Sequence, residues 1–479
     1  MYLNNFEGLE SKEVFRWFAE ISKFPRRSKK EKQISDFLVK FAKDRNLEVY
    51  QDKVYNVIIK KKAFGGYENV SPVIIQGHMD MVCEKTSESK HDFDKDPIEL
   101  IVEGDFLRAN DTTLGADNGI AVAYALALLD SKDIPHPALE VLITSDEEAG
   151  MSGASAVTSE HLSGKTLINL DAEDEEIFWV GCAGGHNIIT EFNIEKEINK
   201  NEALKIEVSG LKGGHSGVEI DKQRANAIKI LGRIFYEIKD YINIVCINGG
   251  SVHNAIAKNA YAVITSENLS NVKTIIEDIS DKIKHEYRIA DPDMNISISN
   301  YDNVKECYTR KLTNDVINFI MLSPDGVLYM SRDIEGLVLT SANNGVVEEK
   351  DNKLYFDVFI RSSSESSSNE IGNRVKALAS ATNAIIFSED SYPAWEYDPD
   401  SKIKDIACEV YKRITGKDAV LKAVHAGLEC GILKKPLPDT DMISIGPNIY
   451  HIHTPKECLS ISSVDTMWKV LKELIINIK

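Results

Sequence analysis

The sequence has 479 residues, of which 43% are hydrophobic and 27% are charged, a composition typical of globular proteins. Its formal net charge of −19 argues against nucleic acid and anionic membranes as partners, because both would repel it. A chain of this length exceeds the size at which one hydrophobic core keeps growing, so we expect two domains.

The compartment can be predicted from three further features. The first residues show no basic and apolar leader, and no apolar run approaches the roughly 18 residues of a membrane span. Seven cysteines, an odd number, are scattered without a Cys-x-x-Cys motif. Reduced thiols in a cytoplasm account for this pattern, so we expect a cytoplasmic protein.

The first region, residues 1–185, alternates helical periods with short apolar runs. This alternation predicts a mixed or parallel sheet covered by helices. We expect helices over residues 11–23, 29–45 and 118–129, and strands over residues 56–61, 73–77, 140–144 and 166–170.

The middle region, residues 186–386, has the pattern of an α+β domain with two related halves. Its first half predicts strands over residues 203–208, 242–248, 258–265 and 294–299, and helices over residues 223–238 and 272–286. Its second half predicts helices over residues 314–321 and 371–381, and strands over residues 337–348 and 353–361.

The last region, residues 387–479, returns to the first pattern, with a helix over 403–414, a strand over 442–445 and a helix over 464–476. The candidate catalytic and metal-binding residues lie on both sides of the middle region. We therefore predict one α/β domain with a central mixed sheet and helices on both faces, interrupted by an inserted α+β domain.

Two adjacent glutamates, Glu147 and Glu148, follow an apolar strand that stops abruptly at three acids. In open α/β sheets ligands collect at the carboxyl ends of strands, so this pair is a candidate site. One carboxylate can hold a metal while the other moves a proton. The alternative is a solvated acidic turn. Candidate ligand residues elsewhere in the chain decide between a functional site and such a turn.

Two candidate partners precede the glutamate pair. His78 ends an apolar strand, and Asp80 can accept a hydrogen bond from its imidazole and so orient it. Asp117 lies in a glycine-bearing turn before an alanine-rich helix. It can bridge two cations or, alternatively, cap the helix.

Two further candidates complete the cluster, since Asp171 follows an apolar strand and His453 precedes a proline turn far downstream. Two histidines and three carboxylates, one of them bridging, suit two divalent ions of the zinc class. Ions about 3.5 to 4 Å apart can share a water and polarise a carbonyl. Glu147 would then be the general base.

The order and wording of the motifs resemble the co-catalytic dizinc exopeptidases, the aminoacylase and carnosinase type of metallopeptidase. The resemblance spans nearly the whole chain and is strongest to the aminoacyl-histidine dipeptidase branch, also called Xaa-His dipeptidase or peptidase D. It rests on Gly-His-Met-Asp-Met-Val, Thr-Leu-Gly-Ala-Asp-Asn-Gly-Ile, Ser-Asp-Glu-Glu-Ala-Gly-Met, Gly-Gly-His-Ser-Gly, His-Ala-Gly-Leu-Glu-Cys-Gly and His-Thr-Pro-Lys-Glu.

The resemblance implies a division of the metal ligands. His78 and Asp171 would hold one ion, Glu148 and His453 would hold the other, and Asp117 would bridge them. The cofactors implied are two divalent ions, zinc first, with manganese or cobalt as alternatives.

The resemblance also implies the catalytic roles. Asp80 would orient the first histidine, and Glu147 would take a proton from the bridging water and deliver it to the leaving amine. The family has a cis peptide after its bridging aspartate, so we expect one between Asp117 and Asn118.

The middle region resembles the lid of that family. His215 would donate a hydrogen bond to the oxyanion, Asn254 would reach the same region, and Arg361 would grip the terminal carboxylate of the substrate. A tight surface turn and a solvated arginine are the alternatives. His425 and Glu429 are expected to help shape the pocket, without assigned roles.

The function implied is dimetal-dependent hydrolysis of dipeptides, foremost Xaa-His dipeptides including β-alanyl-histidine. The expected partner is a small peptide, with no nucleic acid or membrane, and the chain would be a monomer or homodimer. The alternatives are an N-acyl amino acid or tripeptide amidohydrolase of the same architecture and a non-catalytic metal-dependent binding protein. Dimetal phosphoester hydrolysis is disfavoured, because no cluster of basic residues accompanies the motifs.

Overall fold

The computed structural model describes residues 6–479, which form two compact units. The first unit comprises the chain up to Gly181 together with Tyr397–Ala423 and Leu428–Lys479. The second comprises Cys182–Glu396 and the short segment Val424–Gly427.

The second unit extends beyond residue 386, where we predicted its end. The reason is an edge strand, β21 (Ile385–Tyr392), which pairs with β9 (Gly184–Asn193) in the sheet of the second unit. The segment around residue 425 also joins this unit, because Ala183 donates its backbone N–H to the carbonyls of Val424 and Ala426.

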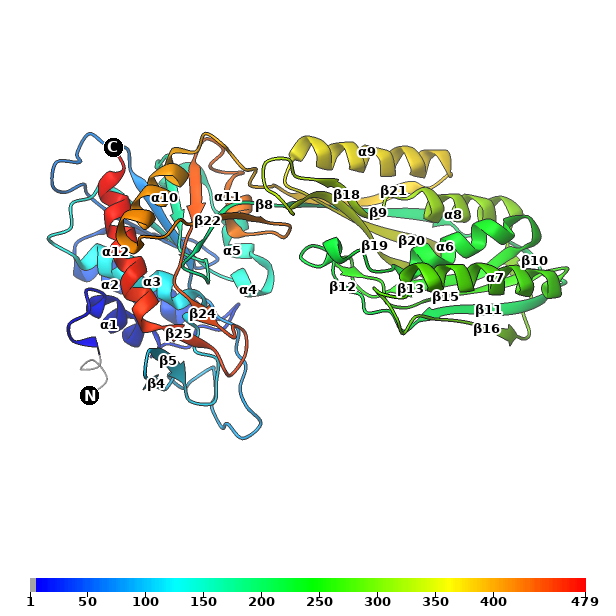
Figure 1. Cartoon of the computed structure of the whole chain (residues 1–479), viewed down its shortest axis with the longest axis horizontal. Coiled ribbons are helices and arrows are strands. Elements are labelled where there is room, and N and C mark those ends of the chain that lie inside the picture. Colours follow the sequence, from blue (N-terminus) through cyan, green and yellow to red (C-terminus); the bar gives the residue numbers. More distant parts are fainter. Residues whose placement is uncertain (1–5) are drawn as a thin grey trace. The chain divides into compact units, whose positions relative to one another are not determined.

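The first unit is built around an eight-stranded sheet (Figure 1). Its strands are β1 (Glu48–Gln51), β2 (Val57–Lys61), β3 (Val73–His78), β6 (Leu139–Thr144), β7 (Thr166–Asn169), β8 (Ile177–Cys182), β22 (Val420–Val424) and β23 (Asp441–Ser444). Across the sheet they follow the order β1-β2-β6-β3-β7-β23-β8-β22. The neighbours β6, β3, β7 and β23 are parallel, so their carboxyl ends meet at one edge.

Helices pack against this sheet and complete the unit. They are α1 (Lys12–Ile21), α2 (Lys32–Asp44), α3 (Ala116–Asp130), α4 (Glu147–Gly150), α5 (Ser152–Ala156), α10 (Lys402–Thr415), α11 (Glu429–Leu433) and α12 (Ile461–Asn477). A small second sheet contains β4 (Leu100–Glu103), β5 (Phe106–Ala109), β24 (Ile449–Tyr450) and β25 (Cys458–Ser460).

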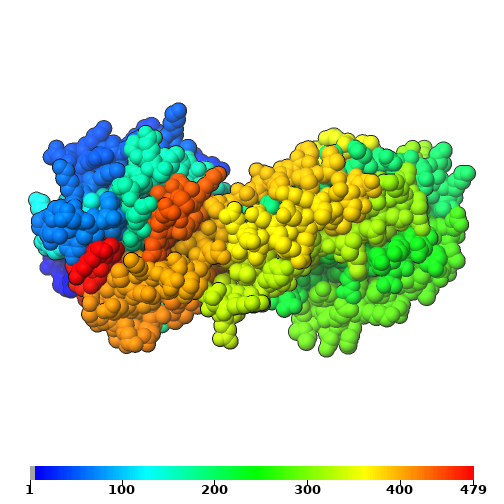
Figure 2. All heavy atoms as spheres, turned by 90° about the horizontal axis from the view of Figure 1, so that it is seen from above, coloured from blue at the N-terminus to red at the C-terminus, as the bar shows by residue number. Residues whose placement is uncertain are grey.

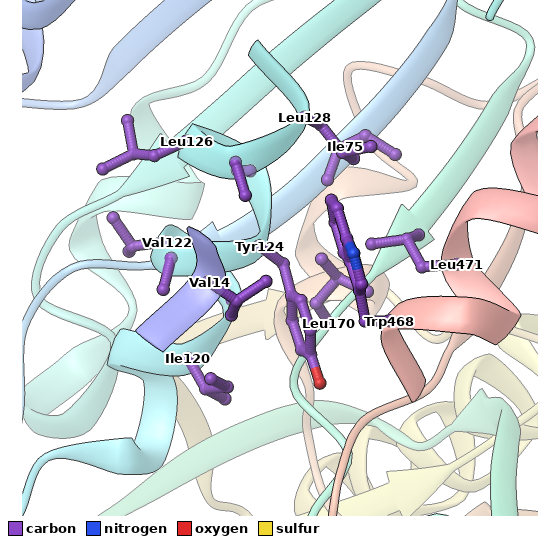
Figure 3. Packing of buried hydrophobic residues seen from close by; sticks show 14 of the residues in the cluster. Val14, Ile75, Ile120, Val122, Tyr124, Leu126, Leu128, Leu170, Trp468 and Leu471 are labelled. Carbon is purple, nitrogen blue, oxygen red and sulfur yellow. The ribbon is translucent and has the colours of Figure 1, made fainter. Parts of the chain in front are cut away.

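The core of the first unit joins segments from the two ends of the chain. Helix α3 is buried over nearly its whole length, as its alanine-rich and leucine-rich sequence requires. Tyr124 on α3 stacks on Trp468 of α12, with ring centroids 5.9 Å apart (Figure 3). The Tyr124 hydroxyl also donates to the carbonyl of Val464 at 2.9 Å. The last helix is therefore part of the same core as the first strands.

The second unit contains a nine-stranded antiparallel sheet covered by a layer of helices (Figure 1). Its other strands are β11 (Glu202–Ser209), β13 (Asn243–Gly250), β15 (Ala260–Ser266), β16 (Asn295–Tyr301), β18 (Gly326–Met330), β19 (Val338–Lys350) and β20 (Lys353–Ser362). The helices are α6 (Ala227–Ile238), α7 (Leu269–Tyr287), α8 (Arg310–Leu322) and α9 (Glu365–Ala381). Shorter pairs are β10 (Lys196–Ile198) with β17 (Glu306–Tyr308), and β12 (Gly214–His215) with β14 (Ala255–Ile256).

Both halves of this sheet share one topology. The strands β13-β15-β11-β16 follow each other across the first half, and β19-β20-β9-β21 do so across the second. Each half has one helix before its central hairpin and one after it, α6 and α7 in the first half and α8 and α9 in the second. Helix α9 lies at the surface of the second half (Figure 2).

The structure contains every helix and strand that we predicted, with shifted ends, and it confirms the predicted fold class of a mixed sheet interrupted by an α+β unit. Several strands were not predicted, among them β1, β8 and β22 in the first sheet and β9, β18 and β21 in the second. β21 lies at the edge of its sheet, and both Ile385 and Phe387 are more than half exposed, so it lacks the buried apolar pattern of a central strand. Over residues 6–479, no helix is long and apolar enough to cross a membrane.

Candidate active site

The five predicted metal ligands come together in the first unit at one edge of its sheet. His78 ends β3, Asp171 follows β7, and Glu148 lies four residues beyond the end of β6. His453 lies in the loop that follows β23 and the short strand β24. Because β6, β3, β7 and β23 are adjacent and parallel, the residues after their carboxyl ends converge.

Asp117 lies between the two histidines. Its Oδ1 is 3.2 Å from Nε2 of His78, and its Oδ2 is 3.2 Å from Nε2 of His453. Asp171 Oδ1 lies 3.5 Å from Nε2 of His78, and Glu148 Oε2 lies 3.0 Å from Nε2 of His453. Each imidazole thus faces one oxygen of the shared aspartate and one carboxylate of its own.

This donor set fits divalent cations. Ligand atoms of His78, Asp117 and Glu148 all lie within 4.8 Å of one another. Imidazole nitrogen with carboxylate oxygen is the chemistry that zinc and its neighbours prefer. The peptide bond between Asp117 and Asn118 is cis, as the sequence resemblance implied.

Asp80 joins the first histidine to the glutamate pair. Its Oδ1 lies 3.3 Å from Nδ1 of His78 and accepts the backbone N–H of Glu147 at 3.1 Å. Its Oδ2 accepts the N–H of Glu148 at 3.2 Å and the hydroxyl of Ser28 at 2.8 Å. Asp80 therefore lies against the imidazole and also holds the turn that carries both glutamates, a second contact that the sequence did not predict.

The electrostatics of the cluster favour bound cations. Burial raises the pKa of Glu147 to about 9; His78 opposes this shift and the carboxylate of Asp171 adds to it. Burial also raises the pKa of Asp171 to about 6. Hydrogen bonds to its two carboxylate neighbours raise the pKa of His453 to about 10. Positive charge at this point would favour the ionised carboxylates.

Glu429, for which no specific role was predicted, lies near His78 and Asp171 with 1% of its surface exposed. Its Oε2 accepts hydrogen bonds from Gln76 Nε2 at 2.6 Å and from the Thr144 hydroxyl at 2.9 Å. Gln76 in turn accepts a bond from Asn169 at 2.5 Å. These three partners lie on β3, β6 and β7, just before the residues of the cluster. Glu429 thus ties together the strands that carry the ligands.

In the second unit, the backbone determines which ring nitrogen of His215 carries the proton. Nδ1 of His215 accepts the backbone N–H groups of Gly217 at 3.2 Å and Val218 at 3.3 Å. Burial lowers the pKa of His215 and so favours the neutral ring. A neutral imidazole that accepts at Nδ1 carries its proton on Nε2. Nε2 of His215 is therefore a hydrogen-bond donor.

Arg361 is 4% exposed, and among the described residues its electrostatic partner is the Tyr392 hydroxyl and not a carboxylate. Its guanidinium lies 4.6 Å from the ring centroid of Phe359 and donates to the Tyr392 hydroxyl at 3.0 Å. Its Nη2 is 3.3 Å from Nε2 of His215. Because both nitrogens are donors, they suit one shared acceptor, and a buried arginine without an acidic partner favours an anion.

The remaining predicted residues also lie in this part of the second unit. The backbone carbonyl of Asn254 accepts the N–H of Ser216 at 2.9 Å, so Asn254 neighbours the segment of His215. His425 is buried, and its Nε2 lies 2.7 Å from the Ser341 hydroxyl.

The sequence missed Tyr392, which holds Arg361. No motif marks this tyrosine. A Cβ at Gly185 would lie 2.3 Å from its ring, so a glycine is required there, and this requirement becomes visible only in the fold.

Comparison with known proteins identifies the family. The family model described as "Peptidase family M20/M25/M40" matches residues 74–477. The chain belongs to this peptidase family. The sequence-based assignment to a metallopeptidase family is thereby confirmed.

Individual relatives agree with this assignment. The chain is 36% identical over 464 residues to the cytosol non-specific dipeptidase of Escherichia coli K12, covering 96% of each chain. It is similar to the crystal structure of aminoacylhistidine dipeptidase from Vibrio alginolyticus, with a TM-score of 0.91, 34% identity and coverage of 99% of this chain and 98% of that one. A tripeptidase from Staphylococcus aureus, at 16% identity and a TM-score of 0.54 over 98% of both chains, shares the fold.

Proposed function

We propose that this chain hydrolyses dipeptides, foremost Xaa-His dipeptides including β-alanyl-histidine, at a pair of divalent cations. The observation that carries the proposal is Asp117, whose two oxygens each lie 3.2 Å from a different imidazole, those of His78 and His453. One carboxylate shared between two histidines can bridge two closely spaced cations, as in a two-metal site. The names of the relatives in Escherichia coli and Vibrio alginolyticus support a dipeptide as substrate.

The residues of the first unit divide the work of the reaction. His78 and Asp171 would hold one cation, Glu148 and His453 would hold the other, and Asp117 would be shared between them. Bound divalent cations supply Lewis acidity, which lowers the pKa of a water and polarises a carbonyl oxygen.

Proton transfer falls to Glu147, which is not needed as a ligand. Burial raises its pKa to about 9, and cations bound beside it would lower this pKa, so that the ionised carboxylate can take a proton from the attacking water. It then delivers this proton to the leaving amine. Asp80 keeps the Nδ1–H of His78 engaged, which leaves Nε2 available to bind a cation.

The second unit supplies donors for the anionic groups of the peptide. Arg361 binds the terminal carboxylate, because its guanidinium is buried and contacts the Tyr392 hydroxyl in place of an acidic side chain. His215 offers its Nε2–H to the oxyanion, and loss of such a donor typically costs about 2.7 to 4 kcal/mol in transition-state stabilisation. Asn254 acts in the same region. A clamp on the carboxylate predicts a preference for short peptides.

Zinc is the proposed metal, with manganese and cobalt as alternatives, because two imidazoles among carboxylates give a donor set of intermediate softness. The cytoplasm is the proposed compartment. The scattered, odd-numbered cysteines support it, as does the cytosolic relative in Escherichia coli.

The proposal is tested with purified protein loaded with zinc, manganese or cobalt and offered three matched substrates: a Xaa-His dipeptide, an N-acyl-histidine and a tripeptide. We expect the highest kcat/KM for the dipeptide. If no Xaa-His dipeptide is cleaved with any of the metals, the dipeptidase assignment is wrong. Faster hydrolysis of the N-acyl amino acid or of the tripeptide would make the chain an amidohydrolase or a tripeptidase instead.

A further inference from the structure

Glu457, to which the sequence analysis gave no role, is 3% exposed and has every acceptor position of its carboxylate occupied. Its Oε2 accepts the backbone N–H groups of Leu114 at 2.8 Å and Gly115 at 3.0 Å. Its Oε1 accepts those of Ala116 at 2.7 Å and Asp117 at 3.3 Å. A carboxylate has about four lone-pair sites, so four successive donors saturate it.

These four donors belong to the turn that presents the shared aspartate. Gly115 has a positive φ of 68°, and the backbone of Asp117 is not helical, with ψ at 109°. Successive N–H groups in such a turn form a concave anion site, here filled by a side chain from the far end of the chain. No side chain of the turn caps helix α3, so these donors depend on Glu457.

Arg26, which is 2% exposed, contacts the same turn through a carbonyl. Its Nη2 donates to the carbonyl of Gly115 at 2.6 Å, and its Nη1 donates to the carbonyl of Met79 at 3.3 Å. A Cβ at Gly115 would lie 2.3 Å from Nη2, and one at Gly119 would lie 2.7 Å from it. Both glycines thus leave room for the guanidinium.

The two charged residues also connect the ligand segments. Glu457 lies four positions after His453, and its N–H donates to the carbonyl of Thr454 at 3.0 Å, which closes the loop between them. Arg26 reaches the carbonyl of Met79, the residue that follows His78. The turn of Asp117 is therefore bonded to the neighbourhoods of both imidazoles.

We propose that Glu457 and Arg26 are positioning residues that set where Asp117 presents its two oxygens to His78 and His453. This inference rests on the proposed function, because the position of the Asp117 oxygens matters for catalysis only if they bind the pair of cations. Glu457 accepts the N–H groups of the turn, and Arg26 binds its carbonyl. Rotation of the turn would move the two aspartate oxygens relative to the imidazoles.

A purely structural role is the competing explanation, and the chain offers a matched control for it. Glu140 in β6 is also 3% exposed, and its carboxylate accepts the N–H groups of Ser163 at 2.7 Å and Gly164 at 3.0 Å. It lies near the amino end of its strand, at the opposite end from the ligands. Substitution of Glu140 should therefore affect stability alone.

The test compares wild type, Glu457→Gln and Glu140→Gln in full-length protein. Thermal unfolding is measured without metal, and Co²⁺ titrations followed by visible absorption and calorimetry give the affinity and number of ions. In Glu457→Gln the amide NH₂ faces two backbone donors, and in Glu140→Gln it faces the Ser163 hydroxyl and the Lys60 ammonium, so both variants should lose stability. Glu457→Gln should also bind at least one Co²⁺ about 10- to 100-fold more weakly, with lower kcat and unchanged KM for a dipeptide. Glu140→Gln should keep the wild-type Co²⁺ affinity.

Each outcome decides one point. If wild type binds fewer than two Co²⁺ ions, the proposed function fails. If wild type binds two and Glu457→Gln binds two with equal affinity, the positioning role of Glu457 is wrong. Should Glu457→Gln not fold, Arg26→Lys is used instead, because lysine keeps the charge and loses the planar fork. Unchanged Co²⁺ affinity in Arg26→Lys would then refute the inference, and weaker binding would support it.

Discussion

Neighbouring carboxylates in this site should respond differently to substitution. Glu147 Oε2 lies 4.0 Å from Nε2 of His78, whereas Glu148 Oε2 lies 3.0 Å from Nε2 of His453. In Glu147→Ala both cation sites keep their ligands, and only proton transfer is lost. A general base contributes about 10²- to 10⁴-fold to the rate, so kcat should fall by that factor. Glu148→Ala leaves His453 with the shared aspartate alone and should lose metal.

The assay measures metal content after dialysis and steady-state hydrolysis of a Xaa-His dipeptide for wild type and both variants. We expect two ions in wild type and in Glu147→Ala, and fewer in Glu148→Ala. Excess metal in the assay should restore activity partly in Glu148→Ala and not in Glu147→Ala. Loss of metal from Glu147→Ala, or wild-type turnover in it, would refute the assignment of Glu147 as the base.

Three further predictions follow from the same structure. Arg361→Lys should raise KM for dipeptides about 10- to 100-fold, because charged hydrogen bonds contribute about 1.5 to 3 kcal/mol. Tyr392→Phe should raise KM less. An unchanged KM in both variants would contradict the role of Arg361 in binding the substrate carboxylate. Trp468→Ala should lower the free energy of unfolding by about 3 to 5 kcal/mol in urea titrations, with metal content retained on refolding. Cations displace protons from His453, whose pKa is about 10, so calorimetric Co²⁺ affinity should weaken as pH falls from about 9 to 6; a pH-independent affinity would contradict this.

Three of the five ligands could be predicted from the sequence because they end or follow apolar strands. His78 and Asp171 come directly after apolar runs, and residues at the carboxyl ends of neighbouring parallel strands meet at one edge. The order of strands was not predictable from the sequence. That order, with β6, β3, β7 and β23 side by side, is what brings His453 to residues more than 280 positions earlier in the chain.

The supporting residues could not be predicted in the same way. Glu457 contacts a turn that precedes it by more than 330 residues, and a buried arginine such as Arg26 resembles a surface arginine in sequence. Tyr392 and Glu429 act through contacts that only the folded chain creates. Burial and hydrogen-bond partners, and not residue type, distinguish these side chains from solvated ones.

The division into halves of the second unit was predictable in part. Strands β13, β15, β19 and β20 have the alternating or apolar patterns that mark strands. β9 precedes the whole first half in sequence and yet pairs with β20 and β21 in the second half. The position of β9 in the sequence therefore does not indicate that it belongs to the second half.

The central claim is a cation pair shared by Asp117. Anomalous X-ray scattering from zinc-loaded crystals at the zinc edge tests it most directly. We predict two peaks about 3.5 to 4 Å apart, one between His78 and Asp171 and one between His453 and Glu148, with Asp117 bound to both. A single peak, or two peaks that do not share Asp117, would contradict the account.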